Sequence, residues 1–484
     1  MMSGAARRGP NKPAILAIIL VSYVMIVLDI SVVLTGLPKI RQDLGFSDAS
    51  LAWVQTAYTL TFGGLLLLGA RAGDMLGRRL MLMVGLAIFT VASVAIGASQ
   101  SAIWMLGWRA VQGLGSAILA PSTLALLQIT FPEGPERTRA VSYYSAAAGA
   151  SATFGLVLGG VLADWLSWRV GFLINLPIGV GLILAARAFV TEGARRPGHF
   201  DLPGALTSTI GMTALAYGFL HAARSGWSDP GSVIAILAAV LCLVAFVFIE
   251  RRQSQPILPL RLFASPGRSG AYIARTLYLG GMVGFFFFTT IYLQDVAAYG
   301  PALTGLAFLP ATLLHVPFSV AVPRLTRWFS LNQLLVAGML IGIVGMAWLS
   351  RVSPQSGYLL GVAAPMLLIG ISQGLTLSPL TSAGVAGVSP EDAGAASGAV
   401  NVAHQLGTSV GLSLLVAISS LGATGLAGPA LTAHRVVLAF DAASVMLVVA
   451  FLVAIVTIVL PHRRHACTVC TVRTASEDTS PARR

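Results

Sequence analysis

The feature that most constrains this chain is a series of long apolar segments separated by short polar ones. We count fourteen such segments, each about 20 residues long, which is the length that a helix needs to cross a bilayer. Barrel strands would instead be about ten residues long with alternating polarity, a pattern that this sequence lacks. The predicted spans are 14–36, 52–70, 81–99, 103–127, 141–163, 169–190, 202–220, 231–249, 269–293, 302–322, 332–350, 357–380, 395–419 and 436–460. The sequence therefore predicts an all-α integral membrane protein.

The composition agrees with this prediction, because charged residues make up only 10% of the 484 positions. An ordinary soluble domain carries about 25% charged residues, so this chain could not form a soluble surface. A net charge of +13 would be typical of nucleic-acid binding, but the arginines lie in the short segments between the apolar runs. That placement is typical of membrane topology, so we expect contact with membrane lipid and none with nucleic acid.

The distribution of basic residues predicts the orientation in the membrane. With a cytoplasmic N-terminus, twenty-one Lys and Arg residues fall in cytoplasmic segments and six in outer segments. Because cytoplasmic loops carry the excess of positive charge, this bias predicts an even number of spans with both termini cytoplasmic. The segment 14–36 is too long for a signal peptide, and no clear cleavage site follows it. We therefore expect a multi-pass protein of the cell inner membrane.

Patterns typical of catalysis and cofactor binding are missing from the sequence. Neither Lys12 nor Lys39 follows glycines at the spacing of a nucleotide-binding phosphate loop, and no H-E-x-x-H metal motif occurs. We expect no enzyme activity and no cofactor, so active transport would use an ion gradient. The sequence HRRHACTVC at 462–470 offers four zinc-type side chains, but they are crowded in a polar tail. Attraction of this tail to anionic lipid is the simpler interpretation, and no metal is expected.

A weak internal repeat indicates two related halves. The fourth predicted span reads Gln-Gly at 112–113 and then Pro121, and the twelfth reads Gln-Gly at 373–374 and then Pro379. Many secondary transporters are built from such repeats, with the substrate site between the halves near the middle of the membrane. A chance similarity between Gly- and Ala-rich helices is the alternative interpretation.

Asp29 is the acidic residue that lies deep inside a well-defined predicted span. A carboxylate at that depth costs about 2.5–3.5 kcal/mol on insertion scales, so it needs a cationic partner or a proton and is a candidate functional residue. Arg109 in the fourth span lies at a similar depth, since both residues are roughly 10 Å below the outer ends of their spans. We predict that Asp29 and Arg109 serve proton coupling, and a purely structural ion pair is the alternative.

The loop after the second span carries a more specific pattern. Residues 70–79 read ARAGDMLGRR, and Asp74, Gly77, Arg78 and Arg79 match the G-x-L-[GA]-D-R-x-G-R-[RK] motif of the major facilitator superfamily. The sequence departs from that motif at its first Gly, its Leu and its first Arg. In the family this motif helps to gate the conformational change, so the resemblance implies a gating loop here.

Other segments resemble the fourteen-span drug:proton antiporter branch of that family. The fourth span resembles its R-x-x-Q-G motif through Arg109, Gln112 and Gly113, and the resemblance implies that this arginine takes part in proton coupling. Further matches lie in LDISVV at 28–33 with LP at 37–38, WVQTAY at 53–58, WRVGFLINLP at 168–177, YLQ at 292–294 and GLAFLP at 305–310. Together they cover about 15–460.

The resemblance implies the major facilitator fold, which consists of two six-helix bundles, here with two extra central helices. The expected parts are a cytoplasmic N-terminus at 1–13, an N-terminal bundle at 14–190, an inserted helix pair at 202–249, a C-terminal bundle at 269–460 and a cytoplasmic tail at 461–484. The expected partners are a small-molecule substrate and protons, and we expect a monomer.

The fifth span departs from the family pattern. The antiporter motif of the family has the form G-P-x-x-G-G, whereas residues 155–160 read GLVLGG. Gly155, Gly159 and Gly160 would still allow close helix packing, but the proline that would kink the helix is missing. This departure leaves the direction of transport open.

Two further polar residues in the second half are candidate substrate contacts. Arg275 lies about six residues into the ninth span, and Gln294 lies at the outer end of that span. Arg275 could instead extend its side chain to the membrane interface. His315 and His404 lie near spans ten and thirteen, where packing as neutral side chains is the preferred interpretation.

The preferred hypothesis is proton-coupled efflux of amphipathic small molecules, such as drugs or antibiotics, by alternating access. One alternative is uptake or facilitated transport of a small metabolite, which the missing proline keeps open. The other is a membrane sensor without transport, which would leave the buried Asp29 and Arg109 without a role.

Overall fold

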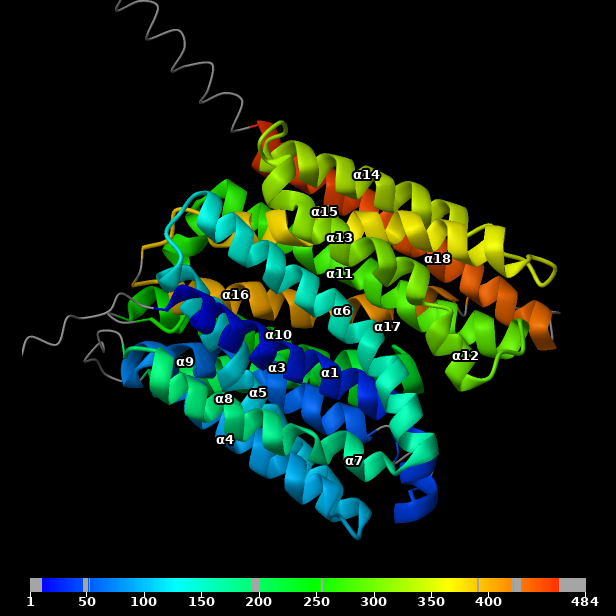
Figure 1. Ribbon diagram of the computed structural model, residues 1–484, viewed down its shortest axis with the longest axis horizontal. Coiled ribbons are helices and arrows are strands. Elements are labelled where there is room, and N and C mark those ends of the chain that lie inside the picture. The colour runs from blue at the N-terminus through cyan, green and yellow to red at the C-terminus, as the bar shows by residue number, and fades with distance from the viewer. Residues whose placement is uncertain are drawn as a thin grey trace, which may run out of the picture.

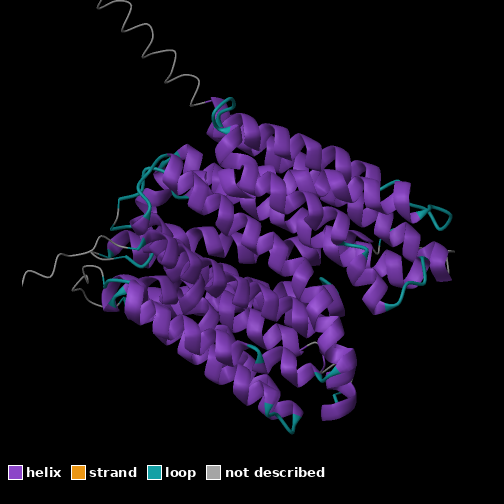
Figure 2. Ribbon diagram, viewed as in Figure 1, coloured by secondary structure: helices purple, strands orange, loops and turns teal. Residues whose placement is uncertain are grey.

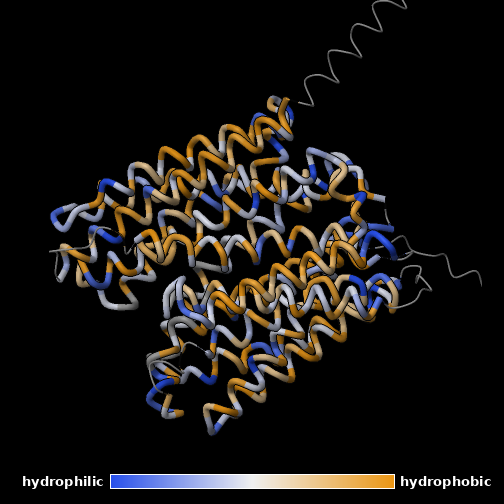
Figure 3. The backbone as a smooth tube through the Cα atoms, turned by 180° about the vertical axis from the view of Figure 1, so that it is seen from behind, coloured by the Kyte–Doolittle hydropathy of each residue, from blue (hydrophilic) through white to orange (hydrophobic). Residues whose placement is uncertain are grey.

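The computed structural model describes residues 11–46, 51, 53–192, 201–253, 256–389, 391–419, 421 and 428–460. Within these ranges every regular element is a helix (Figure 2), which confirms the predicted all-α fold class. Apolar residues occupy the middle of the long helices, and strongly polar residues gather mainly toward their ends (Figure 3). This distribution matches an apolar membrane interior between two aqueous surfaces.

The helices follow one another in two series with a pair between them. The first series is α1 (Lys12–Leu44), α3 (Trp53–Leu76), α4 (Arg78–Gly97), α5 (Ala102–Thr130), α6 (Pro135–Trp165), α7 (Trp168–Leu173) and α8 (Asn175–Phe189). The pair is α9 (Leu202–Ser225) and α10 (Pro230–Arg252). The second series is η1 (Leu260–Ala264), α11 (Pro266–Ile291), η2 (Tyr292–Val296), α12 (Pro301–Leu306), α13 (Leu309–Leu325), α14 (Leu331–Leu349), η3 (Leu359–Ala363), α15 (Ala364–Gly384), α16 (Ala393–Leu406), η4 (Gly407–Gly411), α17 (Leu412–Ser419), α18 (Gly428–Ala454) and η5 (Ile455–Val459).

Each series packs mainly on itself. In the first, α5 packs against α3 and α4, α1 packs against α6, and α4 packs against α8. In the second, α15 packs against α13 and α14, and α11 packs against α18. The helices α9 and α10 pack against each other. Figure 1 shows the two series as two bodies of helices, with α4, α5 and α8 in one and α13, α14 and α18 in the other.

Two helix seams join the series. On one, α6 packs against α13 and α15, and on the other, α16 packs against α3 and α5. The helix α9 contacts both α3 and α17, so the inserted pair lies beside the second seam. Figure 1 shows α6, α11 and α16 in the middle of the molecule, between the two bodies.

Proline positions explain two helix breaks within predicted spans. A proline has no N–H to donate to the carbonyl four residues earlier, and its ring crowds that carbonyl. The helix α7 accordingly ends at Leu173, four residues before Pro177, and α12 ends at Leu306, four residues before Pro310. The predicted spans 169–190 and 302–322 are therefore each formed by two helices in sequence.

Eleven helical segments of the described chain are long and apolar enough to cross a membrane. The predicted spans 52–70, 141–163 and 202–220 also form helices, α3, α6 and α9, but these are not among the eleven. Their sequences contain many Gly, Ser and Thr residues, which lower the mean hydropathy. All three pack against helices of both series or of the inserted pair, so small residues suit their surroundings.

The repeated Gln-Gly pairs occupy matching places in the two series. A Cβ atom on Gly113 of α5 would lie 2.5 Å from the carbonyl oxygen of Tyr58 on α3. A Cβ atom on Gly374 of α15 would lie 2.8 Å from the carbonyl oxygen of His315 on α13. Each glycine therefore lets its helix approach the backbone of the neighbouring helix. The packing favours a true repeat over a chance similarity.

Candidate functional site

A buried ion pair connects the first and fourth predicted spans. Nη1 of Arg109 on α5 lies 2.7 Å from Oδ2 of Asp29 on α1, and the two side chains are 0% and 1% exposed. The structure thus brings together the two residues that the sequence places at matching depth. Removing two charges from water is costly, and it is offset only when additional hydrogen bonds satisfy both groups.

Gln112 supplies part of that additional bonding. Its Nε2 donates to Oδ1 of Asp29 at 2.8 Å, and its Oε1 accepts from Nη1 of Arg109 at 2.6 Å. The same Nε2 lies 2.8 Å from Oγ of Ser93 on α4, which Nδ2 of Asn175 on α8 also contacts at 3.2 Å. Because Gln112 lies one helical turn after Arg109, both reach Asp29 from the same face of α5. The carboxylate is therefore held by two side chains of α5, and side chains of α4 and α8 extend the network around Gln112.

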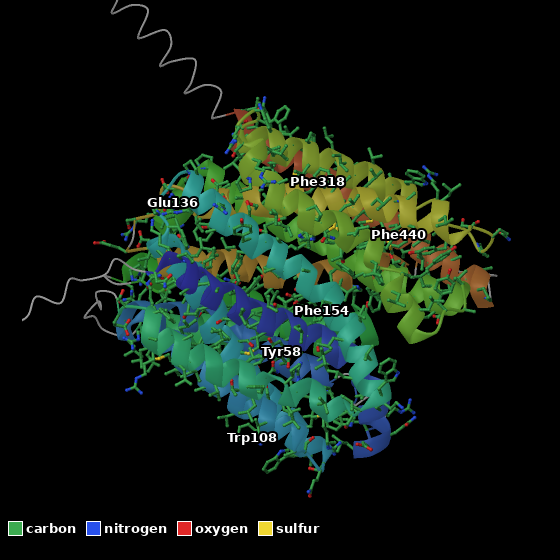
Figure 4. All side chains as sticks on the ribbon, in the orientation of Figure 1. Tyr58, Trp108, Glu136, Phe154, Phe318 and Phe440 are labelled. Carbon is green, nitrogen blue, oxygen red and sulfur yellow. The ribbon has the colours of Figure 1, made fainter. Side chains whose placement is uncertain are left out.

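The guanidinium of Arg109 is also held on its other side. Its Nε donates to the carbonyl oxygen of Val54 at 2.9 Å, and it lies over the ring of Tyr58 at 4.4 Å from the ring centre. The hydroxyl of Tyr58 lies 2.8 Å from Oγ of Ser116. Figure 4 shows Tyr58 deep among the helices of the first series. The ring and the carbonyl fix the position of the arginine while leaving its Nη1 directed at Asp29.

The sequence identified three members of this site and missed the others. Asp29, Arg109 and Gln112 were recognisable from buried charge and from motif spacing. Ser93 gave no signal, because a serine in an apolar span is common, and the Tyr58 ring lay in a motif that did not reveal its role. Chemically, the arrangement can hold a carboxylate in its charged form, or exchange a proton when the arginine and glutamine contacts loosen.

The predicted gating-loop residues lie where α3 meets α4 and α16. Arg78 donates from Nη2 to Oδ1 of Asp74 at 2.6 Å. A Cβ atom on Gly394 would overlap the Asp74 carboxylate, so this carboxylate lies against the first turn of α16. A negative charge is favoured at a helix N-terminus, where backbone N–H groups are unpaired. Asp74 therefore links a helix of the first series to a helix of the second.

Gly77 and Arg79 lie at the start of α4, where they form the turn and its contacts with α8. Gly77 has a φ of +111°, which favours glycine, and a Cβ there would lie 2.6 Å from a carboxylate oxygen of Glu192. That carboxylate accepts from the backbone N–H groups of Arg79 and Leu80, both at 3.1 Å. Nη2 of Arg79 donates to the carbonyl of Arg187 at 2.8 Å. These contacts fix the loop to the end of α8, an anchor that the motif alone did not indicate.

Polar contacts also cross the seams between the series. Nε2 of Gln128 on α5 donates to Oγ of Ser397 on α16 at 2.6 Å. Oγ of Ser142 on α6 lies 3.1 Å from Oγ of Ser378 on α15. The carbonyl of Ser142 accepts from Oγ of Ser319 on α13 at 2.9 Å. At these points the two series are closed against each other.

The three glycines of the fifth span differ in their surroundings. A Cβ on Gly155 would lie 2.7 Å from Cβ of Ser31 and 3.2 Å from the Leu28 carbonyl, so this glycine allows α6 to approach α1. Gly159 is buried. Gly160 has open space around the position of a Cβ, so the prediction that it serves close packing is wrong. Glycine at that position has no packing neighbour to accommodate.

Arg275 and Gln294 lie in different environments. Arg275 is 6% exposed, and its Nη1 donates to Oγ1 of Thr381 at 2.8 Å. The alternative that its side chain extends to the membrane interface is therefore wrong. Gln294 is exposed on the π-helical turn η2 at the end of α11. His315 is buried, and its Nδ1 lies 2.9 Å from Oε1 of Gln373, whereas His404 is partly buried. The His and Cys residues of the tail at 462–470 lie outside the described residues.

Two packed series of membrane-length helices, with a charged pair buried inside the first series, define a polytopic membrane transporter rather than an enzyme. The chain belongs to the Major Facilitator Superfamily, because the sequence profile of that family matches residues 19–412. This membership confirms the resemblance seen in the motifs. It also explains the all-helical fold in two related halves.

Several curated relatives are export or resistance proteins. The cephamycin export protein CmcT of Amycolatopsis lactamdurans is 37% identical, over 95% of each chain. The puromycin resistance protein pur8 of Streptomyces alboniger is 40% identical, over 87% of this chain and 85% of its own. The multidrug resistance protein Stp of Mycobacterium tuberculosis is 31% identical, over 81% of this chain and 73% of its own.

Solved structures show the same fold at low sequence identity. The human organic anion transporter MFSD10 has a TM-score of 0.66 at 15% identity, and the match covers 92% of this chain and 100% of that one. The proton:xylose symporter XylE has a TM-score of 0.63 at 13% identity, covering 91% of this chain and 94% of that one. At these identities the likeness concerns the fold alone.

Proposed function

We propose that this chain exports amphipathic small molecules of the antibiotic type across the cytoplasmic membrane in exchange for protons. The observation that carries the proposal is the buried Asp29–Arg109 pair, which Gln112 connects on both sides. The names of the curated relatives, which include antibiotic export and resistance proteins, support the substrate class and the outward direction. Neither uptake of a metabolite nor a membrane sensor without transport accounts for both the buried pair and the names of the relatives.

In this proposal Asp29 carries the proton. Arg109 and Gln112 stabilise the charged carboxylate, and loosening of their contacts leaves a carboxylate that is stable in this apolar site only when it is protonated. A conformational change that alternately tightens and loosens these contacts would release and load a proton. The contacts of Arg109 with Val54 and Tyr58 suit this role, because they hold the arginine in place when Asp29 is protonated.

The conformational change is alternating access between two bundles, 14–190 and 269–460, with the pair 202–249 at the periphery. We propose fourteen spans, both termini in the cytoplasm, and a monomer embedded in membrane lipid. Asp74 at the start of α16 and the contacts across the seams would stabilise one closed state and break as the bundles rock apart. The gating loop would thus stabilise the closed state until the two bundles separate.

The proton-motive force suffices for useful export. One charge moving across 100 mV contributes about 2.3 kcal/mol. At about 1.4 kcal/mol per tenfold change, this sustains roughly a 40-fold concentration gradient for each net charge moved.

The decisive experiment measures proton release from energised inverted vesicles with a pH-sensitive dye as candidate drugs are added. Asp29→Asn should abolish drug-dependent proton release while the protein remains folded in the membrane. The matched control is Asp441→Asn, since Asp441 is an exposed carboxylate on α18. Drug-dependent proton release that survives Asp29→Asn would overturn the proposal. Counterflow in the inward direction would support uptake, and a folded protein that moves neither protons nor drugs would support the sensor.

A further inference from the structure

Arg275 on α11 carries a buried charge that the proton-coupling mechanism does not use. Its side chain is 6% exposed, and its Nε has no hydrogen-bond partner. Its bonds are to neutral groups: Nη1 donates to Oγ1 of Thr381 at 2.8 Å, and Nη2 lies 3.4 Å from Nδ1 of His404. In the part of the chain that the structure describes, no carboxylate lies within ion-pair distance of this guanidinium.

This situation contrasts with that of Arg109, whose side chain is 0% exposed. Arg109 has the Asp29 carboxylate and Gln112. An isolated buried cation is costly, and charged groups inside membrane proteins usually pair or mark a ligand path. Arg275 therefore needs a negative partner that the described residues do not supply.

The surroundings of Arg275 come from both halves of the molecule. Thr381 lies on α15 and His404 on α16, both in the second series. From the first series, Tyr23 on α1 and Tyr144 on α6 stack at 4.0 Å between ring centres, and both phenol groups lie within electrostatic range of Arg275. Transporters of this kind bind their substrates between the two halves. Arg275 thus lies where a transported molecule would contact both halves.

The chemistry of the cluster selects a planar oxyanion with an aromatic or apolar body. A guanidinium offers parallel N–H groups that match a carboxylate, and its free Nε adds a donor to that face. The hydroxyl of Thr381 already donates to the Leu377 carbonyl, so the further donors for the anion are the hydroxyls of Tyr23 and Tyr144. The stacked tyrosine rings provide an apolar surface for the remainder of the molecule.

We propose that Arg275 is the anchor for a carboxylate, or an equivalent oxyanion, of the exported molecule, so that the transporter favours anionic amphipathic substrates. This inference rests on the proposed export function and specifies its substrate class. It also gives the substrate a compensating role, since the bound anion neutralises the charge that the empty site leaves buried.

The test compares matched acids and esters on the purified full-length protein. Fusidate and benzylpenicillin, each beside its methyl ester, are titrated while the unfolding temperature is followed. The wild type should bind the acids in preference to the esters. Arg275→Gln should weaken binding of the acids by about tenfold or more, as expected for lost charge-assisted hydrogen bonds, and leave the esters unchanged. Arg275→Lys should restore part of the preference, and Arg327→Gln, which alters an exposed arginine, should change nothing.

Several outcomes would overturn the inference. Equal binding of acids and esters by the wild type would do so, as would an equal loss of both in Arg275→Gln. Stabilisation by chloride alone, without competition from either acid, would assign Arg275 to an inorganic anion instead. If neutral or cationic drugs drive Asp29-dependent proton release while neither acid binds, the export function stands and the anion site fails. If no drug drives proton release, the proposed function itself fails.

Discussion

Arg109 lies 2.7 Å from Asp29 although 80 residues separate them in the chain, and neither side chain has access to solvent. Arg109→Gln would leave the Asp29 carboxylate buried without its cation. Breaking a buried pair from one side costs about 3–5 kcal/mol, whereas removing both charges costs much less. We expect the double variant Asp29→Asn/Arg109→Gln to unfold at a higher temperature than Arg109→Gln alone. Thermal unfolding of the detergent-solubilised proteins measures this, and a double variant no more stable than the single one would contradict it.

The close approach of α5 to α3 makes Gly113 intolerant of any side chain. A Cβ there would lie 2.5 Å from the Tyr58 carbonyl and 3.1 Å from the Phe62 backbone nitrogen. Gly113→Ala should therefore destabilise the protein by about 1–3 kcal/mol, as overpacking does. Gly107→Ala on the same helix is the control, because the structure shows open space there. Comparable unfolding temperatures for the two variants would show that the helices can separate at no cost.

The contact between Ser142 and Ser378 provides a direct test of movement between the halves. Their Oγ atoms lie 3.1 Å apart, close enough for a disulfide after a small adjustment. In a background without the native cysteines, Ser142→Cys/Ser378→Cys should cross-link on mild oxidation and stop transport until the disulfide is reduced. Gel mobility and transport are measured on the same vesicles. Cross-linked protein that still transports would mean that this seam does not open.

Asp43, beyond the membrane span of α1, predicts a small dependence of stability on pH. Hydrogen bonds from Trp168 and Arg169 hold the pKa of this carboxyl below its usual range. The stabilisation is present above the unfolded-state pKa of about 3.9 and is lost as the pH falls through the lower folded-state pKa. The Asp43 side chain is 54% exposed, so the effect is at most about 1 kcal/mol.

Asp43→Asn should accordingly lower the unfolding temperature slightly at about pH 6 and leave it unchanged below about pH 3. Thermal unfolding of wild type and variant at both pH values is the measurement. A difference of equal size at both values would assign the effect of the substitution to packing rather than to charge.

The sequence predicted the helices well because hydropathy and length are properties of a single segment. The segment 103–127 corresponds to α5, and 332–350 to α14. The breaks at Leu173 and Leu306 were missed, although each lies four residues before a proline. The π-helical turn at Gly407–Gly411 could not be foreseen, because it depends on how closely α11 approaches.

The candidate site was only partly predictable for a related reason. A buried carboxylate and a buried arginine stand out in an apolar segment, so Asp29 and Arg109 were evident. Ser93 and Tyr58 contribute through the rotation of their helices about their own axes, and apolar runs with weak amphipathicity do not encode that rotation. The environment of Arg275 was unpredictable because its side-chain partners come from two other helices, α15 and α16.

The inserted helix α9 packs on α10 and lies against the backbone of α3 at Gly64, where a Cβ would be 3.3 Å from the Thr209 carbonyl. On the side of the second series it contacts η4 and α17. If the halves move, such close backbone packing means that α9 travels with α3 and slides over α17. The sliding surface on that side is then protein against protein, with hydrocarbon chains kept outside it. The bilayer around the transporter would not have to rearrange there in each cycle.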